Sequence, residues 1–275
     1  IFHLITSLPI TILNILNINT KFILRISGLP KYNGLRKFFW KKLGKKIHKI
    51  TCPTIGTMLD LKSIKIFEEN KIVLLRDPII SVRKISRLKD EKNEYNYDHK
   101  DYLIVAIGRL TKQKNFMFLI NCFQKILNIK KNAKLLIIGE GEQKNNLQNT
   151  IEKKKLLEKI ILLGFKENVY NYLKNANLFI LSSLWEDPGW VLIEAAASNT
   201  LVLASNCQNG PEELIEKNQG GVLFKNNSYE DFIEKFKHVT ELNHKEIYEK
   251  KVFSKRKIKE FTIFNHYLHL KKILN

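Results

Sequence analysis

The sequence predicts an α/β protein with two doubly wound parallel-sheet domains, of which the first is incomplete. Short apolar runs alternate with helical patterns along most of the chain, and this alternation builds a parallel sheet with helices on both faces. The 275 residues can hold two domains, and a hydrophobic content of 44% is enough for real cores. A charged stretch at 83–101 lacks apolar periodicity and separates the two sets of runs.

The first set of runs reads as half of a doubly wound domain. We expect strands at 2–5, 21–26, 49–51 and 71–75, and helices at 9–16, 35–43 and 54–67. The chain starts with Ile1 in what reads as the middle of a domain, so we expect an N-terminal truncation. The predicted organisation is a remaining first domain at 1–80 and a linker at 81–100.

The second set forms a domain at 101–260, and the segment 261–275 that follows it is expected to hold a last helix at 263–274. Its strands are expected at 102–107, 134–138, 159–163, 178–181, 201–204 and 222–224. Its helices are expected to begin near Asn115, Glu142, Val169, Trp190, Pro211 and Tyr229. The chain turns basic and helical again after Ser254.

The most informative stretch is 183–197, where Glu186 and Glu194 stand eight positions apart. Pro188 and Gly189 mark a turn between them, and a run of good helix formers follows. The free N–H groups and the positive dipole end of such a helix suit a phosphate. Glu194 is then placed to accept hydrogen bonds from a sugar hydroxyl, although a Glu near a helix start is also common for dipole reasons alone.

A second segment, 108–115, points to the same ligand. Arg109 and Lys114 leave the end of the predicted strand 102–107 together. In open α/β sheets ligands bind outside the carboxyl ends of the strands, which is where these cations project. The two segments together predict one phosphorylated, hydroxyl-rich ligand.

These segments resemble glycosyltransferase family 4, which has the GT-B fold of two Rossmann-like domains facing a cleft. Gly108 to Asn115 is similar to that family's GRLxxxKG, residues 135–141 to its xIxGxG turn, and Glu186 with Glu194 to its E-x7-E pair. Residues 209–213 and 220–221 resemble later loops. The resemblance is strong over 102–224 and looser before it.

The resemblance implies a donor site for a nucleotide sugar. Arg109 and Lys114 would neutralise the diphosphate, which planar and point cations suit. Glu194 would hold the ribose and Glu186 would face the transferred sugar. The other donor contacts implied are Gly108, Phe165 beside the base, and the amides of Gly189, Trp190 and Val191.

Other positions of the pattern are departures or open questions. Pro188 stands where the family has an aromatic residue and carries no N–H to donate, whereas Asn115 in place of Gly tolerates unusual backbone angles. Ser27 and Gly28 would lie on the acceptor side. His3 resembles a family histidine near the reacting sugar, but a lone His at a strand end is equally a structural residue.

The implied reaction is a retaining sugar transfer to an acceptor hydroxyl, without metal or cofactor. No Asp-x-Asp motif is present, and protein cations would take the place of the metal. Relatives of this kind build surface polysaccharide or lipopolysaccharide on lipid-linked acceptors. A truncated, non-catalytic nucleotide-binding protein of the same fold is the alternative, because one fold hosts many functions.

The formal net charge of +20 is explained equally by a Lys-rich residue usage and by an acidic partner. The helix expected at 35–43 suits an anionic membrane, through Arg36, Lys37, Phe38, Lys41 and Lys42. The alternative is that Phe38 and Phe39 face the core.

Nucleic acid is the other acidic partner that the charge suggests. No nucleic-acid-binding motif appears, so a basic nucleic-acid-binding protein is the weaker reading. Three scattered cysteines without metal spacing indicate a reduced, cytoplasmic compartment. The basic helix at 35–43 adds the expectation of peripheral contact with the inner face of the cytoplasmic membrane.

Overall fold

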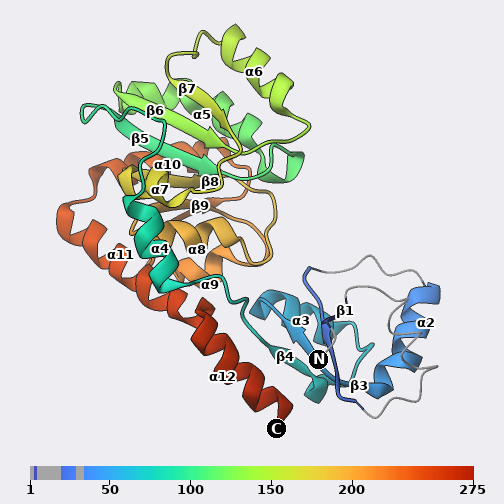
Figure 1. Cartoon of the computed structure of the whole chain (residues 1–275). Helices are drawn as coiled ribbons and strands as arrows, with labels where there is room; N and C mark the ends of the chain where they lie inside the picture. The colour runs from blue at the N-terminus through green and yellow to red at the C-terminus, as the bar shows by residue number, and fades with distance from the viewer. Residues whose placement is uncertain (1–2, 5–19, 29–33) are drawn as a thin grey trace. The chain divides into compact units, whose positions relative to one another are not determined.

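The computed structural model describes residues 3–4, 20–28 and 34–275 (Figure 1). These residues form two compact units, one that ends at Pro78 and includes Glu260–Asn275, and one that spans Ile79–Lys259. The helix expected at 9–16 lies outside the described residues. No helix in the described ranges has the length and apolar character that crossing a bilayer requires.

The first unit contains a parallel sheet in the order β1-β2-β3-β4. Its strands are β1 (His3–Leu4), β2 (Phe22–Arg25), β3 (Ile47–Cys52) and β4 (Ile72–Leu74). Its helices are α2 (Gly34–Leu43), α3 (Ile55–Ser63) and α12 (Ile263–Leu274). The core joins the sheet to the helices through Trp40 on α2, whose ring centroid lies 5.5 Å from that of Phe67.

The second unit contains a six-stranded parallel sheet in the order β10-β9-β8-β5-β6-β7. Its strands are β5 (Tyr102–Ile107), β6 (Ala133–Ile138), β7 (Ile160–Gly164), β8 (Leu178–Leu181), β9 (Val202–Asn206) and β10 (Val222–Lys225). Its helices are α4 (Val82–Asp90), α5 (Phe116–Ile129), α6 (Lys144–Lys153), α7 (Tyr170–Asn175), α8 (Trp190–Ala197), α9 (Pro211–Ile215), α10 (Tyr229–Glu241) and α11 (His244–Lys257). The α/β class with parallel sheets is therefore confirmed.

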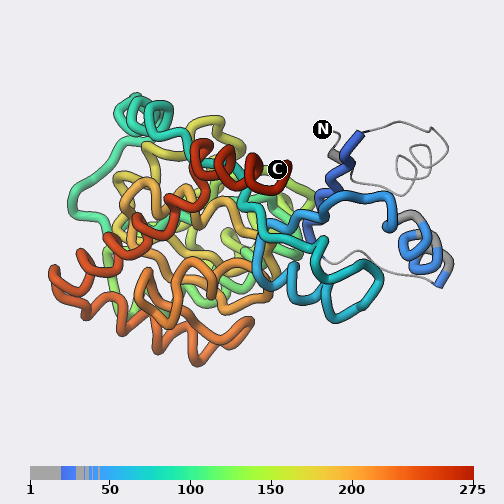
Figure 2. Tube along the Cα trace, turned by 90° about the horizontal axis from the view of Figure 1, so that it is seen from below, coloured from blue at the N-terminus to red at the C-terminus, as the bar shows by residue number. Residues whose placement is uncertain are grey.

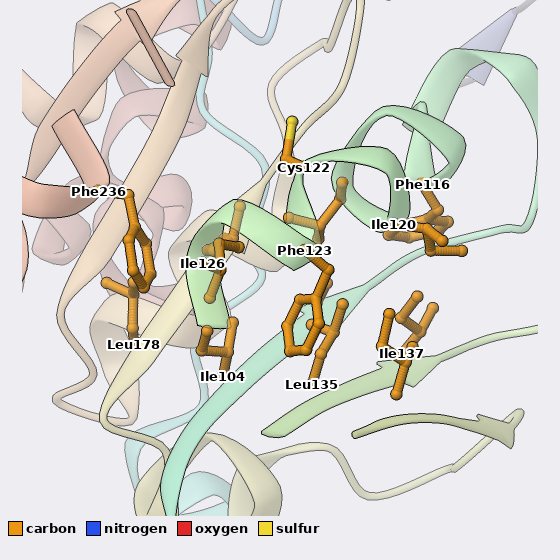
Figure 3. Close-up of a cluster of buried hydrophobic side chains, with 14 of the residues drawn as sticks. Ile104, Phe116, Ile120, Cys122, Phe123, Ile126, Leu135, Ile137, Leu178 and Phe236 are labelled. Atoms are coloured by element: carbon orange, nitrogen blue, oxygen red, sulfur yellow. The ribbon is translucent and has the colours of Figure 1, made fainter. Parts of the chain in front are cut away.

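Helix α5 shows why these segments fold together. Its apolar residues recur every three or four positions, so they form one stripe along the helix. Figure 3 shows Phe123 and Ile126 lying over Ile104 of β5 and Leu135 of β6. All four side chains are fully buried, and this contact packs the second half of α5 on β5 and β6.

The loops after β5 and β6 approach each other closely. A Cβ on Gly139 would lie 1.9 Å from the carbonyl oxygen of Gly108, so the contact requires glycine, and the φ of Gly139 is +148°. The Leu110 amide donates to the Glu140 carbonyl at 2.8 Å. The loop that carries Arg109 is therefore fixed to the loop after β6.

Two segments differ from the sequence prediction. The stretch expected to be a linker contains α4, whose Ile85 is buried, and α4 is fixed to α7 through Asn168 Nδ2, which donates to the Leu88 carbonyl at 2.8 Å. The basic helix expected after Ser254 begins earlier, as α11 at His244, where Asn243 and Glu246 form a capping box. Both differences involve contacts of single polar side chains, Asn168 at α4 and Asn243 at α11, which stand in charged stretches of the sequence.

Candidate functional site

The two motif segments lie side by side in the second unit. The Leu184 amide donates to the Gln113 carbonyl at 2.8 Å, and Gln113 Nε2 donates to the Trp185 carbonyl at 2.9 Å. Ser182 Oγ donates to the Lys114 carbonyl at 2.8 Å. The loop after β8 is thus bonded along its length to the turn before α5, as neighbouring parallel strands allow.

Lys114 and Glu186 form an ion pair at this junction. Lys114 Nζ lies 2.5 Å from Glu186 Oε1, and the two side chains are 12% and 5% exposed. Ser183 Oγ donates to the same carboxylate oxygen at 2.6 Å. The carboxylate is held by two donors, so its position is set before any ligand arrives.

Arg109 differs from Lys114 although both belong to one motif. Its side chain is exposed, and within the part of the chain that the structure describes it has no hydrogen bond or ion pair. Gly108, with a φ of +155°, allows the Lys114 side chain to pass against the backbone, since a Cβ there would meet it at 3.0 Å. The site therefore presents one paired cation and one exposed cation.

Helix α8 begins directly after the loop that carries Glu186. Gly189 precedes it with a φ of +84°, and a Cβ on Gly210 would lie 2.0 Å from the Pro188 carbonyl oxygen. The Glu186 amide donates to the Gln208 carbonyl at 3.1 Å. Because the first amides of a helix have no carbonyl in a preceding turn, the start of α8 can accept an anion.

Glu194 lies further along α8, about 6 Å from Trp190 along the helix axis. It lines a cavity of about 500 Å³ together with Asn168 and Tyr170 at the start of α7 and Lys84 and Arg87 of α4. Figure 1 shows α4 beside α7 and α8. Burial raises the pKa of Glu194 to about 7.

Among the described residues that the sequence assigned to the donor, Glu194 alone lines this cavity. Its lining does not include Arg109, Lys114 or Glu186. Lys114 therefore contacts Glu186 directly, whereas Glu194 lies further along the chain on α8, in a cavity that neither Lys114 nor Glu186 lines.

The other expected site residues are placed as follows. Phe165 is 72% exposed in the turn between β7 and α7, and Trp190 is 56% exposed at the start of α8. Ser27 and Gly28 follow β2 in the first unit. His3 lies in β1, and its side chain is outside the described residues.

The residues expected at a membrane lie on α2. Lys37, Lys41 and Lys42 are exposed, and Phe38 is 64% exposed, so Phe38 does not face the core. Trp40 is the core residue of this helix instead, at 2% exposed. The side chains of Arg36 and Phe39 are outside the described residues.

Sequence reasoning missed three contributors to the site. Ser183 bonds Glu186, and a serine three positions before a glutamate was the only signal for it. Lys84 and Arg87 line the cavity beside Glu194 but belong to the stretch assigned to the linker. The spacing of Ile85 and Leu88, three positions apart, indicates the helix that carries both cations.

The cysteines and the acidic side chains do not form a thiolate or metal site in the part of the chain that the structure describes. Burial raises the pKa of the Cys122 and Cys207 thiols to about 12, so neither is a thiolate nucleophile near neutral pH. Among the described residues no group of three His, Cys, Asp or Glu side chains is arranged to hold a metal ion.

Comparison with curated proteins gives similar sequences over part of the chain. An uncharacterized glycosyltransferase of Methanocaldococcus jannaschii is 39% identical over 140 residues, which cover 50% of this chain and 34% of the relative. An N-acetylgalactosamine-N,N'-diacetylbacillosaminyl-diphospho-undecaprenol 4-alpha-N-acetylgalactosaminyltransferase of Campylobacter jejuni is 36% identical over 124 residues, which cover 45% of this chain and 33% of the relative. The matched part of the chain spans about a third of each of these relatives.

A solved structure has the same fold. The structure of Anabaena HepE in complex with UDP and glucose matches with a TM-score of 0.77 at 13% identity, over 98% of this chain and 76% of that chain. This likeness supports the predicted GT-B fold class. The family model described as glycosyl transferases group 1 matches residues 88–257, more than half of the chain. The chain therefore belongs to the group 1 glycosyl transferases.

Proposed function

We propose that the chain takes part in the transfer of a sugar from a nucleotide-sugar donor to an acceptor hydroxyl. The observation that carries the proposal is the ion pair of Lys114 and Glu186 beside the exposed Arg109, at the start of α8. Cations and a fixed carboxylate at a helix start suit a ligand that has both a diphosphate and hydroxyl groups.

The cations act on the leaving group in this proposal. Arg109 offers a planar fork of donors to two phosphate oxygens, and Lys114 retains further N–H groups beyond the one that meets Glu186. The bond between the anomeric carbon and the diphosphate oxygen breaks, and negative charge develops on the diphosphate. Donors that are already in place stabilise this charge without reorganisation.

The carboxylates act on the hydroxyl groups. Glu186 has one oxygen occupied by Lys114 and Ser183, which leaves its other oxygen to accept hydrogen bonds from the transferred sugar. Glu194 accepts hydrogen bonds from the ribose hydroxyls, and the cavity that Glu194 lines receives the nucleoside. In this proposal the diphosphate lies at the start of α8, about 6 Å along the helix axis from Glu194.

We propose that the transfer proceeds with retention and without a metal ion, as the family resemblance implies. The acceptor oxygen bonds to the anomeric carbon on the face that the diphosphate leaves, and a diphosphate oxygen takes the acceptor proton. Arg109 and Lys114 supply the positive charge that a divalent ion provides in other transferases.

We further propose a lipid-linked saccharide as the acceptor. The support is the name of the Campylobacter jejuni relative, which acts on a diphospho-undecaprenol saccharide. Ser27 and Gly28, after β2, are the residues that we assign to the acceptor side of the first unit, and we assign His3, in β1, to the neighbourhood of the reacting sugar.

The test has two stages. Thermal shift with UDP, GDP and ADP, and with their sugar conjugates, is expected to show stabilisation by at least one diphosphate that Arg109→Ala and Glu194→Ala both weaken. Lys153→Ala, an exposed lysine on α6, is the matched control and is expected to behave like the parent. Diphosphates that leave the melting temperature unchanged contradict the donor site.

The second stage separates an enzyme from a protein that only binds nucleotides. A donor identified by thermal shift is incubated with lipid-linked acceptors, and diphosphate release and product are measured with and without EDTA. Product formation that is insensitive to EDTA supports metal-independent transfer, and NMR of the product reports the anomeric configuration. Donor binding without product from any acceptor favours the non-catalytic alternative.

A further inference from the structure

The charges of the first unit are distributed unevenly. Residues 1–59 contain no Asp or Glu but ten Lys or Arg residues, and residues 261–275 contain two lysines and no acid. All 27 acidic residues therefore lie within 60–260. A Lys-rich residue usage does not explain this pattern, because it is the acids that are missing. The segments that form β1, β2, β3, α2 and α12 carry positive charge alone.

One side of α12 packs on the rest of the first unit. His266 Nδ1 lies 2.6 Å from the Arg76 carbonyl oxygen, near the start of the helix. His48 Nε2 lies 3.2 Å from the Ile273 carbonyl oxygen, and Lys21 Nζ donates to the Leu274 carbonyl at 2.5 Å. These contacts fix both ends of the helix and therefore fix which of its sides faces outward.

The outward side of α12 is apolar over two turns and basic over the last. Two rows of side chains, spaced four positions apart, lie on it: Ile263, Tyr267 and Lys271 in one row, and Phe264, Leu268 and Lys272 in the other. We call these six residues the α12 stripe. Its large apolar side chains are 38–69% exposed, and no residue of α12 is buried. Figure 2 traces the helix, in dark red, to the C-terminus.

The basic end of the stripe lies near other lysines. His48 contacts the last turn of α12, and Lys46 precedes it by two residues, about 7 Å along an extended chain. Lys45 and Lys46 are exposed, and the Lys45 carbonyl oxygen accepts from Lys71 Nζ at 3.0 Å. The lysines of α12 and those before β3 therefore form one basic rim at the amino ends of the strands.

Helix α2 carries a further exposed aromatic side chain, Phe38, among lysines. At 3.6 residues per turn, Phe38 points away from the buried Trp40 and lies between Lys41 and Lys42 on the outer side of the helix. An apolar side chain between cations is the arrangement that suits the boundary between lipid headgroups and acyl chains.

We propose that the α12 stripe and the basic rim bind an anionic lipid bilayer, with the helix lying in the plane of the interface. The apolar residues enter the headgroup boundary, and the lysines meet the lipid phosphates. This inference concerns attachment and does not depend on the proposed transfer. Attachment through the α12 stripe would hold the first unit at the membrane surface, where a lipid-linked acceptor would lie.

The observations favour a membrane over two other occupants. A second copy docking through the same face would bring two basic rims together, and like charges oppose that contact. Nucleic acid would use the lysines, but phosphate contacts give no reason for four large apolar side chains to be exposed beside them. An anionic bilayer accounts for both features.

The test is vesicle flotation of the full chain. Binding to vesicles of phosphatidylcholine with phosphatidylglycerol is expected to exceed binding to phosphatidylcholine alone. Lys271→Gln with Lys272→Gln should weaken the anionic binding by about 25-fold, since each cation near such a surface contributes about five-fold. Phe264→Ser with Leu268→Ser should weaken it more than ten-fold by removing apolar burial.

Matched controls come from the second unit. Lys153→Gln with Lys154→Gln changes two exposed lysines at the end of α6, and Tyr248→Ser changes a tyrosine of α11 that is 68% exposed, whereas Tyr267 is 58% exposed. The double lysine variant and Tyr248→Ser should bind vesicles like the parent, whereas Tyr267→Ser should not. Unchanged melting temperatures show that the stripe variants are folded.

The proposal would be overturned by equal flotation of the parent with neutral and anionic vesicles. It would also be overturned by stripe variants that float like the parent. A third contrary result is a parent dimer in analytical ultracentrifugation that Phe264→Ser with Leu268→Ser dissociates while flotation is unchanged, which would make the stripe a protein interface.

Discussion

Lys114 and Glu186 are 72 residues apart in the sequence, yet their charged groups meet at 2.5 Å with both side chains nearly buried. Ser183 completes the arrangement by donating to the same carboxylate oxygen. The pair links the turn before α5 to the loop before α8. One contact therefore fixes the position of the Glu186 carboxylate within the second unit.

Removing one partner of this pair should destabilise the fold. Lys114→Ala leaves the Glu186 carboxylate buried without its cation, and such a loss costs about 3 to 5 kcal/mol in the free energy of unfolding. Urea denaturation measures it. Lys114→Met with Glu186→Gln removes both charges and should cost clearly less than the sum of the single variants. Additive costs would show that the two groups do not interact.

Arg109 should affect the ligand and leave the fold unchanged. Because its side chain is exposed and has no hydrogen bond or ion pair within the described residues, Arg109→Ala should change the free energy of unfolding by less than about 0.5 kcal/mol. The same variant should lose roughly 2 to 4 kcal/mol of transition-state stabilisation, measured as kcat/KM for sugar transfer. Unchanged kcat/KM would remove Arg109 from the site.

Glu194 should make stability depend on pH. Burial raises its pKa from an ordinary value of 4.5 to about 7 in the folded state, so between these pH values the folded state holds a proton that the unfolded state has lost. The free energy of unfolding should therefore fall as pH rises from about 4.5 to 7, by roughly 3 kcal/mol from this group. Denaturation of Glu194→Gln at pH 5 and pH 8 should lack this fall, and an equal fall in the variant contradicts it.

The same group should make nucleotide binding depend on pH. A carboxylate accepts hydrogen bonds from ribose hydroxyls better than a neutral carboxyl group, so donor binding to the parent should strengthen as pH rises through about 7. Calorimetric titration with the nucleoside diphosphate at pH 6 and pH 8 measures it. Glu194→Gln should bind weakly at both values. Parent affinity that is the same at the two pH values argues against the ribose assignment.

Gly139 should not accept a side chain. The Cβ of Gly139→Ala would lie 1.9 Å from the Gly108 carbonyl oxygen at a backbone angle that L residues rarely adopt, so the loop with Arg109 must move. We expect a loss of roughly 3 kcal/mol in the free energy of unfolding, together with weaker donor binding. Gly34→Ala, where no atom lies within 4 Å of the added Cβ, is the control. A melting temperature of Gly139→Ala close to that of the control would contradict the contact.

The strands of the second unit could be predicted because of what burial requires. A strand covered on both faces must be apolar at every position, and 102–107 and 178–181 are continuous apolar runs in the sequence. The helix starts at Trp190, Pro211 and Tyr229 were predicted correctly, because turn and capping residues mark them locally. Helix α4 was missed because the charged residues around Ile85 and Leu88 were assigned to a linker, and its hydrogen bonds with Asn168 and Asn171 join segments far apart in the sequence.

The sequence by itself determined the residue types of the candidate site and the strand and helix ends on which they stand. Only the tertiary structure decided that Lys114 is paired and nearly buried while Arg109 of the same motif is exposed. It also decided that Glu194 shares a cavity with cations of α4. The physical reason is that motif spacing acts along one segment, whereas pairing and desolvation depend on distances between side chains of different segments, which packing alone sets.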